Sequence, residues 1–173
     1  MRVLLRWVGQ DVSAAGVLET PRRVIDALAE MTSGGESDAA AILATRFDEP
    51  AYAGPVILRG IGFSSLCEHH LLPFVGRALV AYEPKAGRVV GLSKLARLID
   101  VYAHRLQLQE RLTCQVALAI EEHLKPAGVA VLMRAEHACM QCRGARKDAE
   151  MITAHCLGSY LRPGAQAELV ALL

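Results

Sequence analysis

The order of apolar patterns along the chain constrains the fold more than any other feature of the sequence. Alternating apolar residues predict strands at 55–63 and 74–84, and again at 128–140 and 150–160. Between these pairs, residues 89–106 and 109–124 repeat apolar side chains at helical spacing, and an earlier helix is predicted at 20–31. Strands do not alternate with helices, as they do in parallel sheets. We therefore expect an α+β fold, with an antiparallel four-stranded sheet and helices on one face.

Length and composition narrow the class further. A chain of 173 residues suits one domain, with an N-terminal helical region over about 1–50 and a core over about 55–160. The net charge of +1 argues against a nucleic-acid-coating surface, and no apolar run approaches the roughly 18 residues that cross a bilayer. Apolar residues make up 53% of the chain, which is high for a soluble monomer, and such a sheet would leave its edges exposed. We therefore expect self-association, with no membrane or nucleic-acid partner.

The cysteines indicate the compartment. Their number is odd, at five, and the short, interrupted N-terminal apolar stretch does not read as an export signal. Reduced thiols, metal ligands or buried small side chains are favoured over a disulfide framework. The expected location is the cytoplasm.

The segment SSLCEHHLLPF, residues 64–74, places metal-binding and proton-transferring groups between apolar flanks. Cys67 and His70 have a spacing common in zinc loops. A downstream segment, AEHACMQC, adds His137, Cys139 and Cys142. Spacing alone allows a closed structural zinc site with Cys67, His70, Cys139 and Cys142, and it equally allows buried thiols and core histidines without metal.

Strand geometry favours a third possibility. If the strand continues through 137–142, His137 and Cys139 share one face and Cys142 points to the other. The ligands would then be three, Cys67, His70 and Cys139, with the fourth zinc position open to water, as in catalytic sites. His69 and His137 would remain beside the metal, free to move protons.

Other polar groups suit an anionic, hydrogen-bonding substrate. Ser93, Lys94 and Arg97 fall within one turn at a predicted helix start, with Ser93 as its cap, and such a place favours phosphate. Arg143 follows the cysteine segment, although any single basic residue could equally be a solvated surface charge. Gln109-Glu110 at the next helix start also reads as a cap with a first-turn acid. Spacing does not choose among hydrolysis, lyase chemistry and nucleotide binding.

Four segments taken together resemble the GTP cyclohydrolase I family, from about Trp7 to Gly158. They are LETPRRV, SLCEHHLLPFVGRALVAYEP, VVGLSKLARLIDVYAHRLQLQERLT and GVAVLMRAEHACMQCRGARK. The resemblance implies the T-fold, whose subunits join their sheets into a barrel, usually in a decamer of two pentameric rings. It also implies that GTP is converted to 7,8-dihydroneopterin triphosphate and formate, the entry step to folate and other pterins. Zinc-activated water would attack C8 of the guanine.

The resemblance also assigns roles to individual residues. The zinc ligands would be Cys67, His70 and Cys139, and the proton-transfer histidines would be His69 and His137. Glu110 would accept hydrogen bonds from the guanine edge, with Gln109 beside it, and Ser93 would lie at the ribose. The triphosphate would be bound by Lys94, Arg97 and Arg143, joined by Arg23 from another subunit.

Some residues depart from the family pattern, and other functions remain open. Cys142 beside the metal segment is unexpected, and so are His155 and Cys156 where the family is rich in Thr and Ser. One alternative is a relative that stops at an earlier product or uses a modified purine nucleotide. Another is a non-catalytic T-fold protein that binds nucleotides. A deazaguanine-pathway nitrile reductase shares the fold, but its thiol nucleophile is not expected in a CEHH context.

Overall fold

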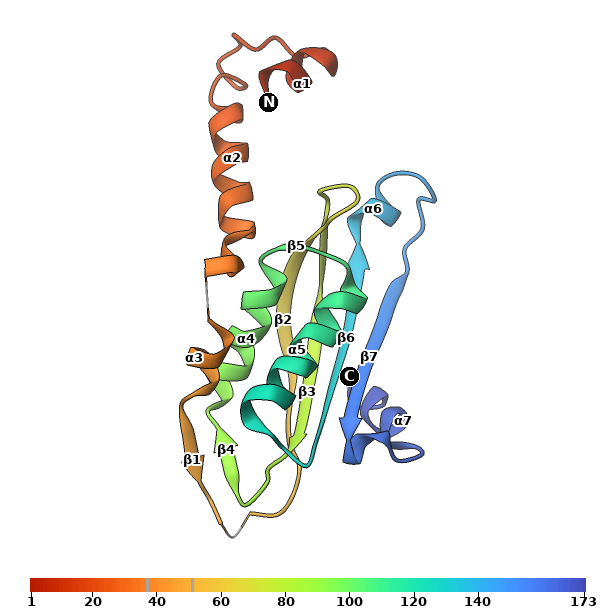
Figure 1. Ribbon diagram of the computed structural model, residues 1–173. Helices are drawn as coiled ribbons and strands as arrows, with labels where there is room; N and C mark the ends of the chain where they lie inside the picture. Colours follow the sequence, from red (N-terminus) through yellow and green to blue (C-terminus); the bar gives the residue numbers. More distant parts are fainter. Residues whose placement is uncertain (37, 51) are drawn as a thin grey trace.

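A sheet with the strand order β5-β2-β3-β6-β7 forms the centre of the computed structural model, which describes residues 1–36, 38–50 and 52–173 (Figure 1). Four strands run antiparallel, namely β2 (Val56–Cys67), β3 (Pro73–Glu83), β6 (Gly128–His137) and β7 (Glu150–Gly158). The two-residue β5 (Leu106–Gln107) pairs in parallel with the end of β2. The predicted α+β class and antiparallel four-stranded core are confirmed, and the arrangement is consistent with the T-fold.

Two helices cover one face of the sheet, α4 (Leu92–Ala103) and α5 (Gln109–Leu124) (Figure 1). The predicted apolar stripe of α5 is fully buried at Leu112, Val116 and Ile120. These side chains join a core with Phe63, Phe74 and alternate residues of β3 and β6. Burial of this continuous apolar layer fixes both helices on the sheet.

The opposite face is also partly covered, which the expectation of helices on one face did not include. The 3₁₀ turn η2 (Ser159–Leu161) and the short helix α7 (Ala165–Val170) pack there. The reason lies in the strands beneath: β3 and β6 direct Leu79, Ala81, Ala130 and Leu132 to this side at one end. Farther along, the same face carries charged Arg77 and Arg134, which need no cover.

The N-terminal part is built from short elements. These are α1 (Arg2–Trp7), α2 (Thr20–Met31), η1 (Ser33–Glu36), α3 (Ala39–Leu43), and β1 (Arg46–Asp48), which pairs with β4 (Arg88–Val90). Pro21 lies in the first turn of α2, as predicted, where its missing N–H costs nothing. Figure 1 shows α2 projecting beyond the sheet, and it contains no buried residue. Among the described residues, no helix combines the length and apolarity needed to span a bilayer.

The strand predicted to run to residue 140 ends earlier. β6 stops at His137, and Ala138–Gln141 form the short helix α6. The ladder with β3 ends at the pair Phe74–His137, and β3 begins with Pro73, which has no N–H to extend it. The expectation that residues 137–142 continue as a strand was therefore wrong.

Candidate active site

The loop between β2 and β3 presents the CEHH residues at one end of the sheet. It closes through two backbone bonds, from the Cys67 N–H to the Leu72 carbonyl and from the Leu71 N–H to the Cys67 carbonyl, each 2.9 Å. Leu71 adopts the left-handed conformation, with φ of +54°, which lets the chain reverse. The Glu68 N–H donates to the Gln107 carbonyl of β5 at 3.1 Å, so this small strand fixes the loop.

Cys67 and His70 of this loop meet Cys139 of α6. Their ligand atoms all lie within 4.8 Å of one another, and Cys67 Sγ is 3.7 Å from His70 Nδ1. Donors bound to one zinc ion at about 2.0–2.3 Å lie less than roughly 4.6 Å apart, so small side-chain shifts bring all three to a common ion. We call these three residues the donor cluster. Thiols and an imidazole are the donor types that zinc prefers.

Cys142 is not part of this cluster. It follows α6, its side chain is exposed, and the metal-compatible group found among the described residues contains only the other three. The geometry thus gives an open set of three donors and not the closed set of four. Cys139 reaches the cluster from a helical turn, although the prediction assumed a strand.

The two thiols of the cluster influence each other. Burial, and then the adjacent Cys67 thiol, raise the pKa of the Cys139 thiol. Two neighbouring thiolates repel, and a bound cation would remove that penalty, which is the usual coupling between metal binding and deprotonation. On its other side, His70 Nε2 lies 3.1 Å from an Arg143 guanidinium nitrogen.

His137 lies beside the cluster at the end of β6. Its Nε2 is 2.8 Å from Gln109 Oε1, and its ring stacks on Phe74 with centroids 4.7 Å apart and planes 4° apart. Burial lowers the pKa of His137, while the charge of nearby Glu110 acts in the opposite direction. His137 and Cys139 also line a cavity of about 420 Å³. An imidazole is therefore held next to the donors and next to open space.

An ion pair connects the CEHH loop to α5. Two guanidinium nitrogens of Arg111 donate to the Glu68 carboxylate, at 2.5 and 3.1 Å, and this pairing lowers the pKa of Glu68. The bidentate geometry aligns the loop with the helix turn that carries Glu110. The sequence reasoning overlooked Arg111 and Phe74, although both lie inside the quoted motifs. His69 is exposed on the same loop, with its ring centroid 6.1 Å from that of His70.

Most of the predicted phosphate- and ribose-binding residues lie elsewhere in the subunit. Three of them, which we call the α4 start, lie in the first two turns of α4: Ser93, Lys94 and Arg97. Gly91 occupies the cap position that was expected for Ser93. The preceding Val90 N–H donates to the Tyr82 hydroxyl at 3.0 Å, and Tyr82 pairs with Val56, the first residue of β2.

The distance between the α4 start and the donor cluster follows from the course of α4, whose last residue, Ala103, accepts a hydrogen bond from the Ser65 hydroxyl of β2 at 2.6 Å. Lys94 lies nine residues before Ala103, about 14 Å along the helix, and Cys67 lies two residues beyond Ser65, about 7 Å along the strand, so Lys94 and Cys67 are roughly 20 Å apart. Figure 1 shows β4, which leads into α4, at the end of the sheet opposite α6. One chain therefore does not bring the α4 start to its own donor cluster. Arg143 does lie at the cluster, whereas Arg23 is exposed on the projecting α2.

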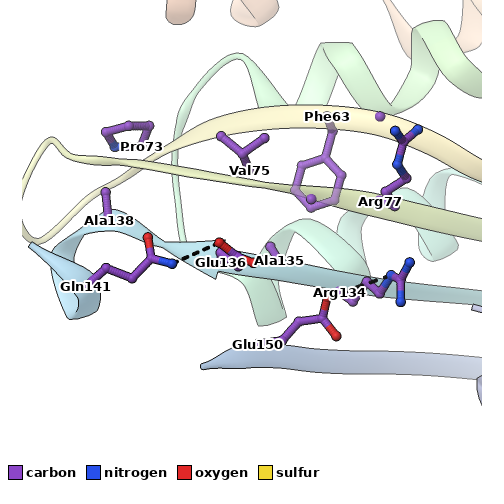
Figure 2. Close-up of a pocket in the computed structure, with 12 residues that line it drawn as sticks. Phe63, Pro73, Val75, Arg77, Arg134, Ala135, Glu136, Ala138, Gln141 and Glu150 are labelled. Atoms are coloured by element: carbon purple, nitrogen blue, oxygen red, sulfur yellow. Dashed lines mark hydrogen bonds and ion pairs between the residues drawn. The ribbon is translucent and has the colours of Figure 1, made fainter. Parts of the chain in front are cut away.

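A second cavity, of about 530 Å³, opens on the sheet face away from α4 and α5 (Figure 2). Its wall includes Arg77, Arg134 and Glu150, and Arg134 pairs with Glu150 at 3.8 Å. No residue predicted to act in catalysis, substrate binding or metal binding lines it. The donor cluster, His137 and Arg143 gather instead at the end of the sheet where β2 and β6 end and β3 begins.

Comparison with known proteins agrees with this geometry. A family model described as GTP cyclohydrolase I matches residues 1–173. The chain is 49% identical over 162 residues to GTP cyclohydrolase 1 of Bartonella quintana (strain Toulouse), covering 92% of this chain and 78% of that protein. It is 47% identical over 161 residues to GTP cyclohydrolase 1 of Rickettsia massiliae (strain Mtu5), covering 92% and 85%. Among solved structures, the archaeosine synthase QueF-Like in the apo form matches with a TM-score of 0.48 and 18% identity, over 60% of this chain and 94% of that one. The match over the whole chain and the two close relatives place this protein in the GTP cyclohydrolase I family of enzymes.

Proposed function

We propose that the protein is a zinc-dependent GTP cyclohydrolase that hydrolyses GTP at C8 to 7,8-dihydroneopterin triphosphate and formate. The observation that carries this proposal is the open donor cluster with His137 held beside it. An open site of this composition is typical of catalytic zinc and not of structural zinc. The reaction would be the first step of folate and pterin biosynthesis, carried out in the cytoplasm by one T-fold domain.

The donor cluster would hold the metal through Cys67, His70 and Cys139. Zinc in such a site supplies a Lewis acid that makes water a nucleophile near neutral pH. His137 and His69 would transfer protons as the imidazole ring of guanine opens, because imidazole groups exchange protons in this pH range.

The guanine edge would be recognised at the start of α5. Its two adjacent N–H donors suit a carboxylate, and Glu110 is exposed in the first turn of that helix, close enough to influence His137. Arg143 would bind phosphate from the same chain, because its guanidinium group already lies at the cluster.

The remaining substrate contacts would come from neighbouring copies. Within one chain, Lys94 of the α4 start lies roughly 20 Å from Cys67 of the donor cluster, by the stretches of α4 and β2 that separate them. Lys94 and Arg97 of one copy would therefore bind the triphosphate at the cluster of another, with Ser93 at the ribose and Arg23 of a further copy. Several cations are needed, since a single surface Lys or Arg holds a triphosphate weakly.

The edges of the sheet support such an assembly. β7 ends the sheet on one side, and on the other β5 covers only Leu66 and Cys67 of β2 in the described structure. Free strand edges pair readily with another chain, so joining the edges of neighbouring copies would close the barrel of a T-fold. Ile25 of α2 is 58% exposed on a helix without buried residues, which indicates a further contact between copies. We propose a decamer of two pentameric rings with active sites between subunits.

Incubation of zinc-loaded protein with GTP tests the proposal. Release of formate together with pterin fluorescence, and the product mass of dihydroneopterin triphosphate, are expected. Metal-stripped protein should be inactive until zinc is restored. A ring-opened product without pterin fluorescence would indicate an earlier-stage enzyme, and GTP binding without turnover would indicate a nucleotide-binding protein.

A further inference from the structure

Gln109 is a buried amide whose hydrogen-bonding groups are fully used inside the protein. It is the first residue of α5, and its side chain is 1% exposed. Its Nε2 donates to the Met133 carbonyl at 3.1 Å, the Met151 carbonyl at 3.0 Å and Thr153 Oγ1 at 3.1 Å, while Oε1 lies 2.8 Å from His137. With these partners, the amide is not free to read a substrate in this arrangement.

The orientation of this amide is dictated by its surroundings. Backbone carbonyls of β6 and β7 accept hydrogen bonds and cannot donate them, so the NH₂ group must face Met133 and Met151. Reversing the amide would place an oxygen against both carbonyls and bury unsatisfied acceptors. Oε1 is therefore the atom that faces His137.

Two threonines support the same assignment. The Thr113 hydroxyl donates to the Gln109 backbone carbonyl at 2.8 Å, and Thr113 and Thr153 hydroxyl oxygens are 2.6 Å apart. Since the Thr113 proton is already engaged, Thr153 must donate to Thr113, and Thr153 Oγ1 remains to accept from the Gln109 amide. The two protons of the amide serve three acceptors, so at least one of these hydrogen bonds is shared, and all three require the NH₂ group on this side.

The orientation of the Gln109 amide determines which nitrogen of His137 carries the proton. An amide oxygen can only accept, so His137 Nε2 must carry the proton, and in the neutral ring Nδ1 holds the free lone pair. Phe74, which is 1% exposed, stacks on the ring face and keeps the ring from turning. Among the described residues, no hydrogen-bond partner is found for Nδ1.

We infer that Gln109 is a positioning residue that holds His137 in the Nε2–H tautomer, so that Nδ1 is the atom that exchanges protons with the substrate. This inference rests on the proposed function and deepens it, because it assigns the working atom of the proton-transfer group. It gives Gln109 a role different from the substrate contact expected from the sequence. Gln109 acts only through His137.

The resting protein allows a direct test without GTP. Zinc-loaded protein with ¹⁵N-labelled histidine is studied by solid-state NMR, and the His137 signals are assigned by their loss in His137→Asn. Wild-type protein should show a hydrogen-bonded Nε2–H and an unprotonated Nδ1. An Nδ1–H ring in the wild type would overturn the inference whatever the variants do, and this spectrum does not depend on any cyclohydrolase activity.

Two substitutions at Gln109 distinguish the effect of its acceptor oxygen from the effect of its side-chain volume. Gln109→Met fills a similar volume without an acceptor, so the Nε2–H signal should give way to mixed tautomers and kcat should fall by about 10²-fold, the usual cost of a misplaced group. KM for GTP and zinc content should stay unchanged. Gln109→Glu keeps an oxygen that faces His137, and burial against the Met133 and Met151 carbonyls favours its protonated form, whose O–H replaces one amide N–H. This variant should retain the Nε2–H signal and more turnover than Gln109→Met.

Gln115→Leu is the matched control. Gln115 lies on the same helix and accepts a hydrogen bond from Gln107 at 2.7 Å, without touching His137. It should lose a comparable amide bond while keeping the His137 spectrum and turnover. Equal turnover in Gln109→Met and Gln109→Glu would remove the acceptor role. A raised KM for GTP with unchanged kcat would show that Gln109 contacts the substrate and does not position His137.

Discussion

Replacement of Gly76 by alanine should weaken the sheet beneath the active site. Gly76 lies in β3 opposite Ala135 of β6. A Cβ atom at this position would lie 2.0 Å from the Arg134 carbonyl oxygen and 2.6 Å from the Ala135 Cβ. Carbon–oxygen contacts between strands are normally about 3.3 Å or longer, so the two strands would have to separate by about 1 Å.

The size of the effect can be stated in advance. Overpacking of this kind costs about 1–3 kcal/mol of unfolding free energy. For a chain of this length each kcal/mol lowers Tm by about 2–4 °C, which gives a fall of roughly 2–12 °C. Differential scanning calorimetry at one fixed protein and zinc concentration measures it, because ligands and association also shift Tm.

A glycine on the neighbouring strand provides the control. A Cβ atom at Gly62 of β2 would meet nothing nearer than an Arg77 guanidinium nitrogen at 4.0 Å, so Gly62→Ala should stay within about 0.5 kcal/mol of the wild type. The same melting temperature for both variants would refute the close approach of β3 and β6. Gly76→Ala should also reduce turnover, since Phe74 and His137, which stack, each lie two residues from the disturbed pair.

Further predictions concern the metal, the phosphates and proton transfer. Serine at either cysteine of the donor cluster, or alanine at its histidine, should remove zinc and activity, whereas Cys142→Ser should keep both. Metal analysis measures the zinc content. Loss of zinc from Cys142→Ser would support the closed structural site of four ligands instead. Alanine at Arg143 or at either cation of the α4 start should raise KM for GTP far more than for analogues without phosphates, because each charge-assisted contact contributes about 1.5–3 kcal/mol. Equal losses for both kinds of substrate would exclude these residues from phosphate binding. His137→Ala should retain zinc and GTP binding, as measured by metal analysis and calorimetry, yet lose about 10²–10⁴-fold in turnover. Near-normal turnover per folded, zinc-loaded subunit would make His137 a structural residue.

The sequence was sufficient for elements whose pattern extends over several turns or residues. The stripe through Leu112, Val116 and Ile120 predicted α5 at 109–124, its observed bounds, because a helix of this length repeats its burial pattern several times. The four-residue helix α6 has no such repeat, and its start depends on where β3 begins, at Pro73, which is far away in the sequence. Local pattern could not reveal that dependence.

The same limit applies to the candidate site. Residue type and spacing selected Cys67, His70, Cys139 and Cys142 as candidate ligands, because few side chains bind zinc. The structure brings the first three together, although the choice of these three had assumed an extended strand where the chain forms α6. Residue type and spacing were not enough to show that the Gln109 side chain forms its hydrogen bonds within the protein, since the residues that it contacts lie on β6 and β7. Contacts between side chains on different strands depend on the strand register, which cannot be read from a single sequence.

The separation of the α4 start from the donor cluster has a genetic consequence. Under the proposed assembly, each active site takes these two parts from different chains, so a defect in one part leaves the other part of the same chain usable by a neighbour. Two inactive alleles, one altered at the cluster and one at Lys94, would then complement each other when expressed together. Random mixing in equal amounts would restore about a quarter of the sites, those in which both intact parts meet, as expected for an interface built from two different patches. An allele defective in one part would conversely impair sites that it shares with wild-type chains.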